Sequence, residues 1–208
     1  MYNPPAFRET RLDVLHALIR QHPLGLLISG GAGGLMANPI PFLVQPEVGE
    51  HGRLLAHMAR ANDQLQVLRE GGEILVVFQG AQAFVTPSWY VSKSEHGKVV
   101  PTWNYVTVQV RGRATVVDDA GWLRDHVGAM TASREAGRAE PWAVEDAPED
   151  YIAAQLRGIA GVEVEITAIE GKWKISQNRN AADREGVVAG LRRDGDEVMA
   201  ALVEAGSR

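Results

Sequence analysis

The chain has 208 residues, which is the length of one compact domain or at most two. Hydrophobic residues make up 45% of the chain and charged residues 23%, as is usual for a globular protein that can bury its own core. The absence of cysteine excludes disulfide scaffolds, cysteine nucleophiles, and cysteine-ligated zinc or iron–sulfur centres. The net charge of −5 offers nucleic acid no general attraction.

We expect a cytoplasmic protein that does not enter the membrane. No stretch reaches the roughly 18 uninterrupted apolar residues of a membrane helix. The first residues, Met1-Tyr2-Asn3-Pro4-Pro5, show no basic stretch followed by an apolar one, so we expect no signal peptide. A chain without cysteine is also compatible with a reducing compartment.

The first half of the chain mixes helical and extended patterns. Apolar residues at helical spacing predict a helix over 12–20, which His22-Pro23 ends. Apolar runs separated by turn residues predict three strands, at 24–29, 36–44 and 52–58. A short helix follows at 62–69, and a hairpin around Gly80 is expected to join strands at 73–79 and 83–86.

The second half adds two alternating strands and four helices. Valines at every second position predict a half-exposed strand over 105–117, and a similar pattern predicts one over 161–169. Helical periodicity predicts helices at 119–136, 148–158, 183–191 and 194–205. The expected fold is therefore mainly β with peripheral helices, an antiparallel sheet or barrel of the α+β class. We expect a single domain over 1–208 with a C-terminal helical extension at about 181–206.

The first candidate site is the segment His57-Met58-Ala59-Arg60-Ala61-Asn62, at a predicted junction between a strand and a helix. A guanidinium, an imidazole and an amide meet there beside the free N–H groups that begin the helix. This combination suits an anion, especially a phosphate. The alternative is an ordinary polar strand end in which Asn62 is the N-cap of the helix.

A second candidate site combines two aromatic segments, Thr86-Pro87-Ser88-Trp89-Tyr90 and Val100-Pro101-Thr102-Trp103-Asn104-Tyr105. Aromatic faces beside hydroxyl and amide groups can hold a planar heterocycle. The alternative is that these bulky side chains pack the mouth of a barrel. Hydrolase chemistry is not expected, because no nucleophile elbow surrounds Ser88.

The third candidate is the basic, amide-rich segment 171–180, which could contact a phosphate or nucleic acid. It could equally be the solvated end of a hairpin. No metal site is expected, because the six histidines are scattered and none has metal-ligand spacing.

In this order, the segments resemble the PaiB-type proteins, known as FMN-binding negative transcriptional regulators. The resemblance covers nearly the whole chain. It is carried by Met1–Phe7, Ala37–Phe42, His57–Asn62, Val77–Gly80, Ser88–Tyr90, Val100–Tyr105 and Gly171–Asn178.

This family is similar to the FMN-binding split barrels, so the resemblance implies a six-stranded antiparallel Greek-key barrel. It also implies a homodimer with FMN in a groove between the subunits. The residues implied to bind the cofactor are Asn38, Ile40, His57, Met58, Arg60, Asn62, Ser88, Trp89, Thr102, Trp103, Lys174 and Gln177.

The resemblance also implies a role for each segment. Residues 57–62 would lie near the FMN phosphate, residues 36–42 would pass beside the isoalloxazine, and residues 172–178 would reach in from the partner subunit. Because 37–42 contains no cation, the phosphate would rest on Arg60 and Lys174.

Three functions stay open at this point. The first is a flavin-binding protein that acts as an FMN-dependent oxidoreductase on a small molecule. The second is a negative transcriptional regulator, with or without bound FMN, and the third is a dimeric scaffold whose cofactor site has degraded. Tight DNA binding is not expected, because residues 181–208 carry four arginines against six carboxylates.

Overall fold

The computed structural model describes residues 1–206 and divides into two compact units. The first unit comprises Met1–Leu18, Gln79–Gln109 and the residues from Glu170 onward. The second unit comprises Ile19–Phe78 and Val110–Ile169. Three long strands pass from one unit into the other, so the chain connects the units through its sheet.

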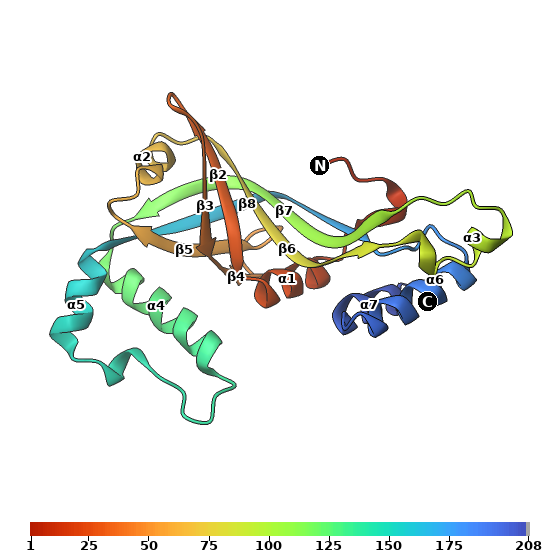
Figure 1. Cartoon of the computed structure of the whole chain (residues 1–208). Coiled ribbons are helices and arrows are strands. Elements are labelled where there is room, and N and C mark those ends of the chain that lie inside the picture. Colours follow the sequence, from red (N-terminus) through yellow and green to blue (C-terminus); the bar gives the residue numbers. More distant parts are fainter. Residues whose placement is uncertain (207–208) are drawn as a thin grey trace. The chain divides into compact units, whose positions relative to one another are not determined.

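The strands form a sheet in the order β3-β2-β6-β7-β8-β5-β4, and the short β1 pairs with β8 (Figure 1). Their bounds are β1 Arg8–Glu9, β2 Leu24–Gly31, β3 Gly34–Pro41, β4 Leu43–Gln45, β5 Arg53–Ala59, β6 Glu73–Val85, β7 Thr102–Val117 and β8 Ile159–Lys174. The pairings of β2 with β3 and β6, and of β5 with β4 and β8, are antiparallel. The described residues thus form eight strands, of which β1 and β4 have only two and three residues.

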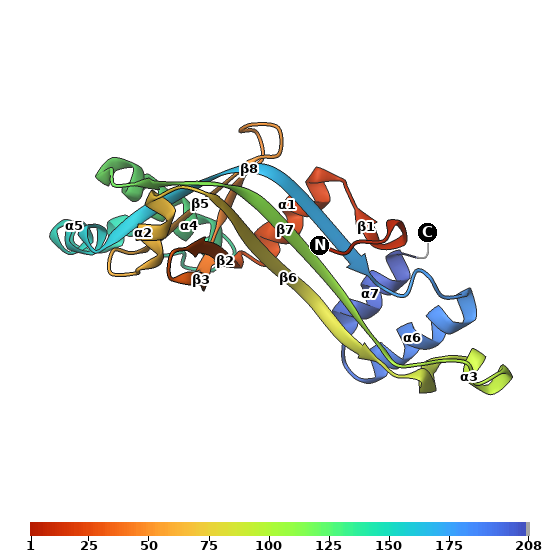
Figure 2. The same ribbon diagram turned by 90° about the horizontal axis from the view of Figure 1, so that it is seen from above.

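Seven α-helices and three 3-10 turns, formed by the described residues, accompany the sheet (Figure 2). The helices are α1 Leu12–Gln21, α2 Gln64–Arg69, α3 Ser92–Glu95, α4 Ala120–Glu135, α5 Glu149–Arg157, α6 Ala181–Arg193 and α7 Glu197–Ala205. The 3-10 turns are η1 Pro5–Phe7, η2 Pro87–Trp89 and η3 Val144–Asp146. None of the helices within residues 1–206 has the length and apolar character needed to span a bilayer.

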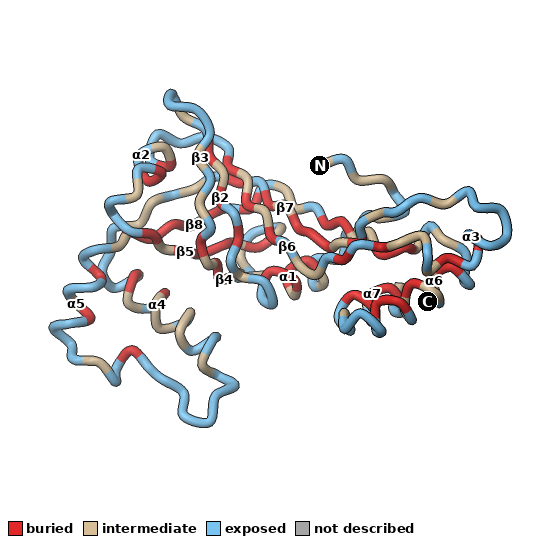
Figure 3. The backbone as a smooth tube through the Cα atoms, in the orientation of Figure 1, coloured by how far each residue is buried: buried red, intermediate tan, exposed pale blue. Residues whose placement is uncertain are grey.

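The second unit buries alternate residues of its strands, which appear as red segments along the tube in Figure 3. Leu27, Val76 and Val162 are fully buried, and the Phe42 and Phe78 rings meet edge to face with centroids 5.6 Å apart. A satellite core lies between α4 and α5, formed by Leu123, Val144, Ile152 and Leu156. Burial at every second position is what a sheet covered on one face requires.

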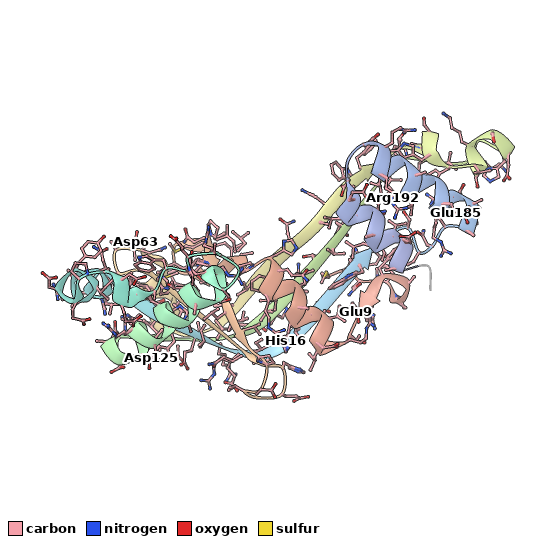
Figure 4. All side chains as sticks on the ribbon, turned by 90° about the horizontal axis from the view of Figure 1, so that it is seen from below. Glu9, His16, Asp63, Asp125, Glu185 and Arg192 are labelled. Carbon is pink, nitrogen blue, oxygen red and sulfur yellow. The ribbon has the colours of Figure 1, made fainter. Side chains whose placement is uncertain are left out.

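In the first unit, α6 and α7 pack side by side (Figures 1 and 2). Val187 on α6 and Met199 and Val203 on α7 are fully buried. These two helices correspond to those predicted at 183–191 and 194–205. In Figure 4, Glu185 and Arg192 mark the polar side of α6, and Arg192 forms ion pairs with Glu197 and Glu204.

The hairpin predicted around Gly80 is wrong. Residues 73–85 form the single strand β6 instead of a hairpin around Gly80. Gly80 keeps extended backbone and lacks the positive φ of turn glycines such as Gly34, whose φ is 101°. β6 lies between β2 and β7 in the sheet, but its pairing with β2 covers residues 75–77, so Gly80 lies in the part of the strand that extends past β2. The strands β7 and β8 are also longer than expected, by three residues before 105 and five after 169.

Candidate functional site

The residues implied to bind the cofactor lie in both units, six in each. Those of the second unit are Asn38, Ile40, His57, Met58, Arg60 and Asn62. Those of the first unit are Ser88, Trp89, Thr102, Trp103, Lys174 and Gln177. Each group has its own internal geometry.

In the second unit, Asn38, Asn62 and Gln64 form an amide cluster between β3 and the start of α2. Asn38 Nδ2 donates to Gln64 Oε1 at 2.8 Å. The backbone N–H of Gln64 donates to Asn62 Oδ1 at 3.0 Å. Asp63, labelled in Figure 4, is the N-cap residue of α2, one position later than the sequence indicated. Gln64, which the sequence did not single out, therefore joins two of the implied cofactor residues, Asn38 through its side chain and Asn62 through its backbone N–H.

Gln64 is fully buried and holds this cluster to the sheet. Its Nε2 donates to the carbonyl oxygen of Leu27 at 3.1 Å and to Ser29 Oγ at 3.0 Å. A buried amide is stable only when its donors and acceptor are all paired. Every one of these partners lies on β2, β3 or the start of α2, so the cluster has a single well-defined arrangement.

Arg60, two residues before Asn62, forms an ion pair with Asp118 just after β7. The second carboxylate oxygen of Asp118 accepts from Arg69 of α2 at 2.8 Å. Hydrogen bonds from Arg69 and then Arg60 lower the pKa of Asp118 below its usual range. Arg60 Nε also donates to the carbonyl oxygen of Arg157, 3.0 Å away. Two guanidinium groups thus share one carboxylate.

His57 takes part in a partly buried contact between β5 and α4. Its Nδ1 lies 3.1 Å from Nε2 of His126, and the ring of Trp122 stacks on His126 with centroids 5.0 Å apart. Trp122 Nε1 donates to Glu163 at 2.7 Å. Burial lowers the pKa of His57, and burial together with the His57 ring lowers the pKa of His126 to about 4. Both rings are therefore neutral at pH 7.

Ile40 and Met58 lie in the hydrophobic core of the second unit. They are 4% and 6% exposed. Their side chains therefore offer a ligand almost no surface.

In the first unit, Lys174 at the end of β8 is held by the start of β7. Its ammonium group donates to Thr102 Oγ1 and to the carbonyl oxygen of Trp103. Burial and then the charges of Lys172 and Arg179 lower the pKa of Lys174. A lysine in this position gains from a nearby anion, because an anion would relieve the repulsion among the three cations.

The chain turns sharply just after Lys174. Ser176 has a φ of 64°, which is uncommon for a residue other than glycine, and Asn104 exchanges hydrogen bonds with its hydroxyl at 2.9 and 3.2 Å. Gln177 folds back on this turn, donating to the carbonyl oxygen of Trp173 and accepting from the N–H of Ile175 at 2.8 Å. The amide of Gln177 is therefore occupied by backbone groups.

The other aromatic residues of the first unit differ in exposure. Trp89 lies against α6, where a Cβ at Gly186 would overlap the Trp89 carbonyl oxygen and a Cβ at Gly190 would overlap its indole. Trp103 is 54% exposed and contacts the Phe84 ring edge to face. Ser88 accepts a hydrogen bond from Lys93 at 3.1 Å. Trp103 is thus the implied aromatic residue whose ring is most open to a ligand.

The fold is shared with flavin-associated proteins of known structure. It matches the FAD and heme binding protein from Mycobacterium smegmatis with a TM-score of 0.61 and 20% identity, over 88% of this chain and 80% of that chain. It matches the flavocytochrome Anf3 from Azotobacter vinelandii with a TM-score of 0.58 and 15% identity, over 80% of this chain and 69% of that chain. The chain therefore has the α+β antiparallel split-barrel fold that the sequence indicated.

The family follows from the sequence matches. The family model "Putative FMN-binding domain" matches residues 1–168. The chain is 27% identical to protease synthase and sporulation protein PAI 2 of Bacillus subtilis, over 98% of this chain and 97% of that protein. It is 33% identical to an uncharacterized protein of Aspergillus fumigatus, over 95% of this chain and 93% of that protein. The chain belongs to this FMN-binding domain family, which confirms the resemblance to the PaiB type.

Proposed function

We propose that this chain binds FMN and uses it in an oxidoreductase reaction on a small molecule. Membership of the family supports the cofactor, and the amide cluster of Asn38, Asn62 and Gln64 is the observation that carries the proposal. The cluster is polar and held by hydrogen bonds, and its Asn62 follows Arg60 by two positions in the sequence. Such a cluster suits the carbonyl and N–H groups of a flavin ring, and the guanidinium suits the flavin phosphate.

The charges of the second unit fit a phosphate. FMN carries a dianionic phosphate, while Arg60 and Arg69 share the single carboxylate of Asp118. The Arg60 and Asp118 side chains are 40% and 44% exposed, so solvent screens and weakens their ion pair. A phosphate can therefore compete with Asp118 for Arg60.

The flavin, when bound, would supply the electron transfer. The protein would then bind the flavin, orient the substrate against it and exclude competing reactions. The proposal predicts that protein purified without added cofactor shows a flavin absorption spectrum. Anaerobic addition of NADH or NADPH is expected to bleach that spectrum. A flavin-loaded protein that neither nucleotide reduces would contradict the oxidoreductase part of the proposal.

We also propose that the chain forms a homodimer, and an apolar face of the β2–β3 hairpin supports this. The antiparallel register places one set of residues on the same side of both strands. This apolar hairpin face consists of Leu24, Leu26, Ile28, Leu35, Ala37, Pro39 and Pro41. Leu24 and Leu35 are 63% and 83% exposed. An uncharged sheet face of this kind is typical of a surface that a partner covers.

The dimer can be tested by light scattering at micromolar concentration. We expect a dimer for the wild type and a monomer for Leu26→Glu, which places a charge at the centre of the apolar hairpin face. Leu12→Glu is the matched control, since Leu12 is 37% exposed on α1 and Leu26 is 38% exposed on β2. A monomeric wild type would overturn the proposal, as would a Leu26→Glu variant that stays dimeric.

A further inference from the structure

We infer that Gln64 is a positioning residue that fixes Asn38 as a hydrogen-bond acceptor for the N3–H group of the flavin ring. The inference rests on the proposed FMN function and names the group of the cofactor that this part of the site would select. It follows from the hydrogen bonds of Gln64 with Leu27, Ser29 and Asn38, which fix the orientation of the two amides in turn.

The first step fixes the orientation of the Gln64 amide. Its Nε2 lies 3.1 Å from the carbonyl oxygen of Leu27, which can only accept hydrogen bonds. The nitrogen end must therefore face Leu27, because the reversed amide would place two buried oxygens against each other. Ser29 Oγ, 3.0 Å from the same nitrogen, takes its second proton.

The second step fixes Asn38. With Nε2 toward the sheet, Gln64 Oε1 points to Asn38 and can only accept. Asn38 must then present its Nδ2, which it does at 2.8 Å. The other end of the Asn38 amide, Oδ1, receives no hydrogen bond from residues 1–206 and is not among the polar atoms buried without a partner. It is an acceptor of fixed orientation that remains accessible.

The third step concerns the ligand. A free asparagine can present either end of its amide to a ligand, whereas the hydrogen bond to Gln64 occupies one N–H of Asn38 and fixes its oxygen as a preorganised acceptor. The oxidised isoalloxazine ring has a single N–H group, at N3. A preorganised acceptor selects this group without the cost of ordering the side chain on binding. Gln64 itself is buried and acts only through Asn38.

The test compares FMN with N3-methyl-FMN, which lacks the N3 proton. We expect the wild type to bind FMN about tenfold more tightly than N3-methyl-FMN, the effect of losing one hydrogen bond. In Asn38→Ala the two affinities should become equal. In Gln64→Met the preference should also be lost although Asn38 is intact, while Gln66→Met, an exposed position on the same helix, should keep it.

Several outcomes separate this inference from the proposed function. Equal affinities in the wild type, or a folded Gln64→Met variant that keeps the preference, would overturn the role of Gln64 while FMN binding stands. Absence of FMN binding to the wild type would overturn the proposed function and, with it, the assignment of N3. The contact itself can be followed by NMR in the wild type, even if Gln64→Met does not fold. We expect slow solvent exchange of one Asn38 side-chain amide proton, and fast exchange of both protons would contradict the hydrogen bond.

Discussion

Arg60 and Asp118 form an ion pair that ties the end of β5 to the end of β7. The residue that the sequence singles out as the phosphate anchor therefore already has an anionic partner. Because both side chains are well exposed, solvent screens the pair and a dianionic phosphate can replace the carboxylate. This arrangement makes Arg60 and Asp118 opposing determinants of FMN affinity.

Replacing Arg60 with alanine should weaken FMN binding by about 10- to 150-fold. This range corresponds to the loss of a charge-assisted hydrogen bond of about 1.5–3 kcal/mol. Riboflavin, which has no phosphate, should bind equally to the wild type and to Arg60→Ala. Arg138→Ala removes another exposed, ion-paired arginine and serves as the control. Equal FMN affinities of wild type and Arg60→Ala in fluorescence titrations would place the anchor elsewhere.

Replacing Asp118 with asparagine should have the opposite effect. The substitution keeps the shape of the side chain but frees the charges of Arg60 and Arg69. We expect FMN affinity to rise by up to about tenfold at low salt, and the gain to shrink as added salt screens the charges. Titrations at two salt concentrations measure this effect. An affinity that falls would show that Asp118 orients Arg60 for the phosphate instead of competing with it.

The protein should lose stability as the pH falls from about 6.5 toward 4. The pKa of His126 is lowered to about 4 in the folded state from 6.5. Within this interval the unfolded chain binds a proton that the folded chain does not, so the free energy of unfolding decreases with decreasing pH. The slope is up to about 1.4 kcal/mol per pH unit for this histidine.

Urea unfolding at several pH values checks this expectation. His126→Phe keeps an aromatic ring against Trp122 and should flatten the dependence on pH. His22→Gln, at an exposed position, should keep the wild-type slope. A wild-type slope that His126→Phe does not change would assign the effect to other groups.

Two glycines within helices should respond in opposite ways to alanine. A Cβ at Gly190 of α6 would overlap the Trp89 ring, so Gly190→Ala should destabilise the protein by about 1–3 kcal/mol. A Cβ at Gly128 of α4 would meet nothing within 4 Å, so Gly128→Ala should stabilise the protein by about 0.5–1 kcal/mol. Thermal unfolding compares the two. A neutral Gly190→Ala would mean that Trp89 can move away from α6.

Much of the fold could be predicted from local patterns. The helix expected at 12–20 is observed as Leu12–Gln21, and the one expected at 62–69 as Gln64–Arg69. In both segments the apolar residues recur at the spacing of a helix, and this spacing is visible in the sequence without knowledge of the packing. The hairpin predicted at Gly80 is wrong, because a single glycine occurs both in turns and within long strands and the local sequence does not distinguish the two.

The partners of the candidate site could not be predicted in the same way. Gln64 meets Asn38, 26 residues earlier, and His126 meets His57, 69 residues earlier. Such pairs depend on which strands and helices become neighbours, and spacing within one segment does not contain that information. For Trp89 a signal did exist, since Gly186 and Gly190 are four residues apart and so lie on one face of a helix.

We expect no tight sequence-specific DNA binding by this chain at physiological salt. The basic segment 172–179 has three cations, but Lys172 is buried between two tyrosine rings and Lys174 is bonded to the start of β7. Arg179 lies over the Tyr90 ring. Specific readers bind at about 10⁻⁸ to 10⁻¹¹ M through several phosphate contacts.

A mobility-shift assay against DNA upstream of the protein's own coding sequence, with unrelated DNA as control, tests this expectation. It is run at ~150 mM salt, because phosphate contacts depend on the salt concentration. A specific complex at nanomolar protein would make a transcriptional regulator the better account of the function.

Isothermal titration of the cofactor-free protein with FMN, and in parallel with riboflavin, tests the proposed function most directly. If the second unit binds the ring through its amide cluster and the phosphate through Arg60, FMN should bind more tightly than riboflavin by at least tenfold. That difference should disappear in Arg60→Ala. Failure of the wild type to bind FMN at all would contradict the proposed function, and equal binding of FMN and riboflavin would contradict the phosphate site.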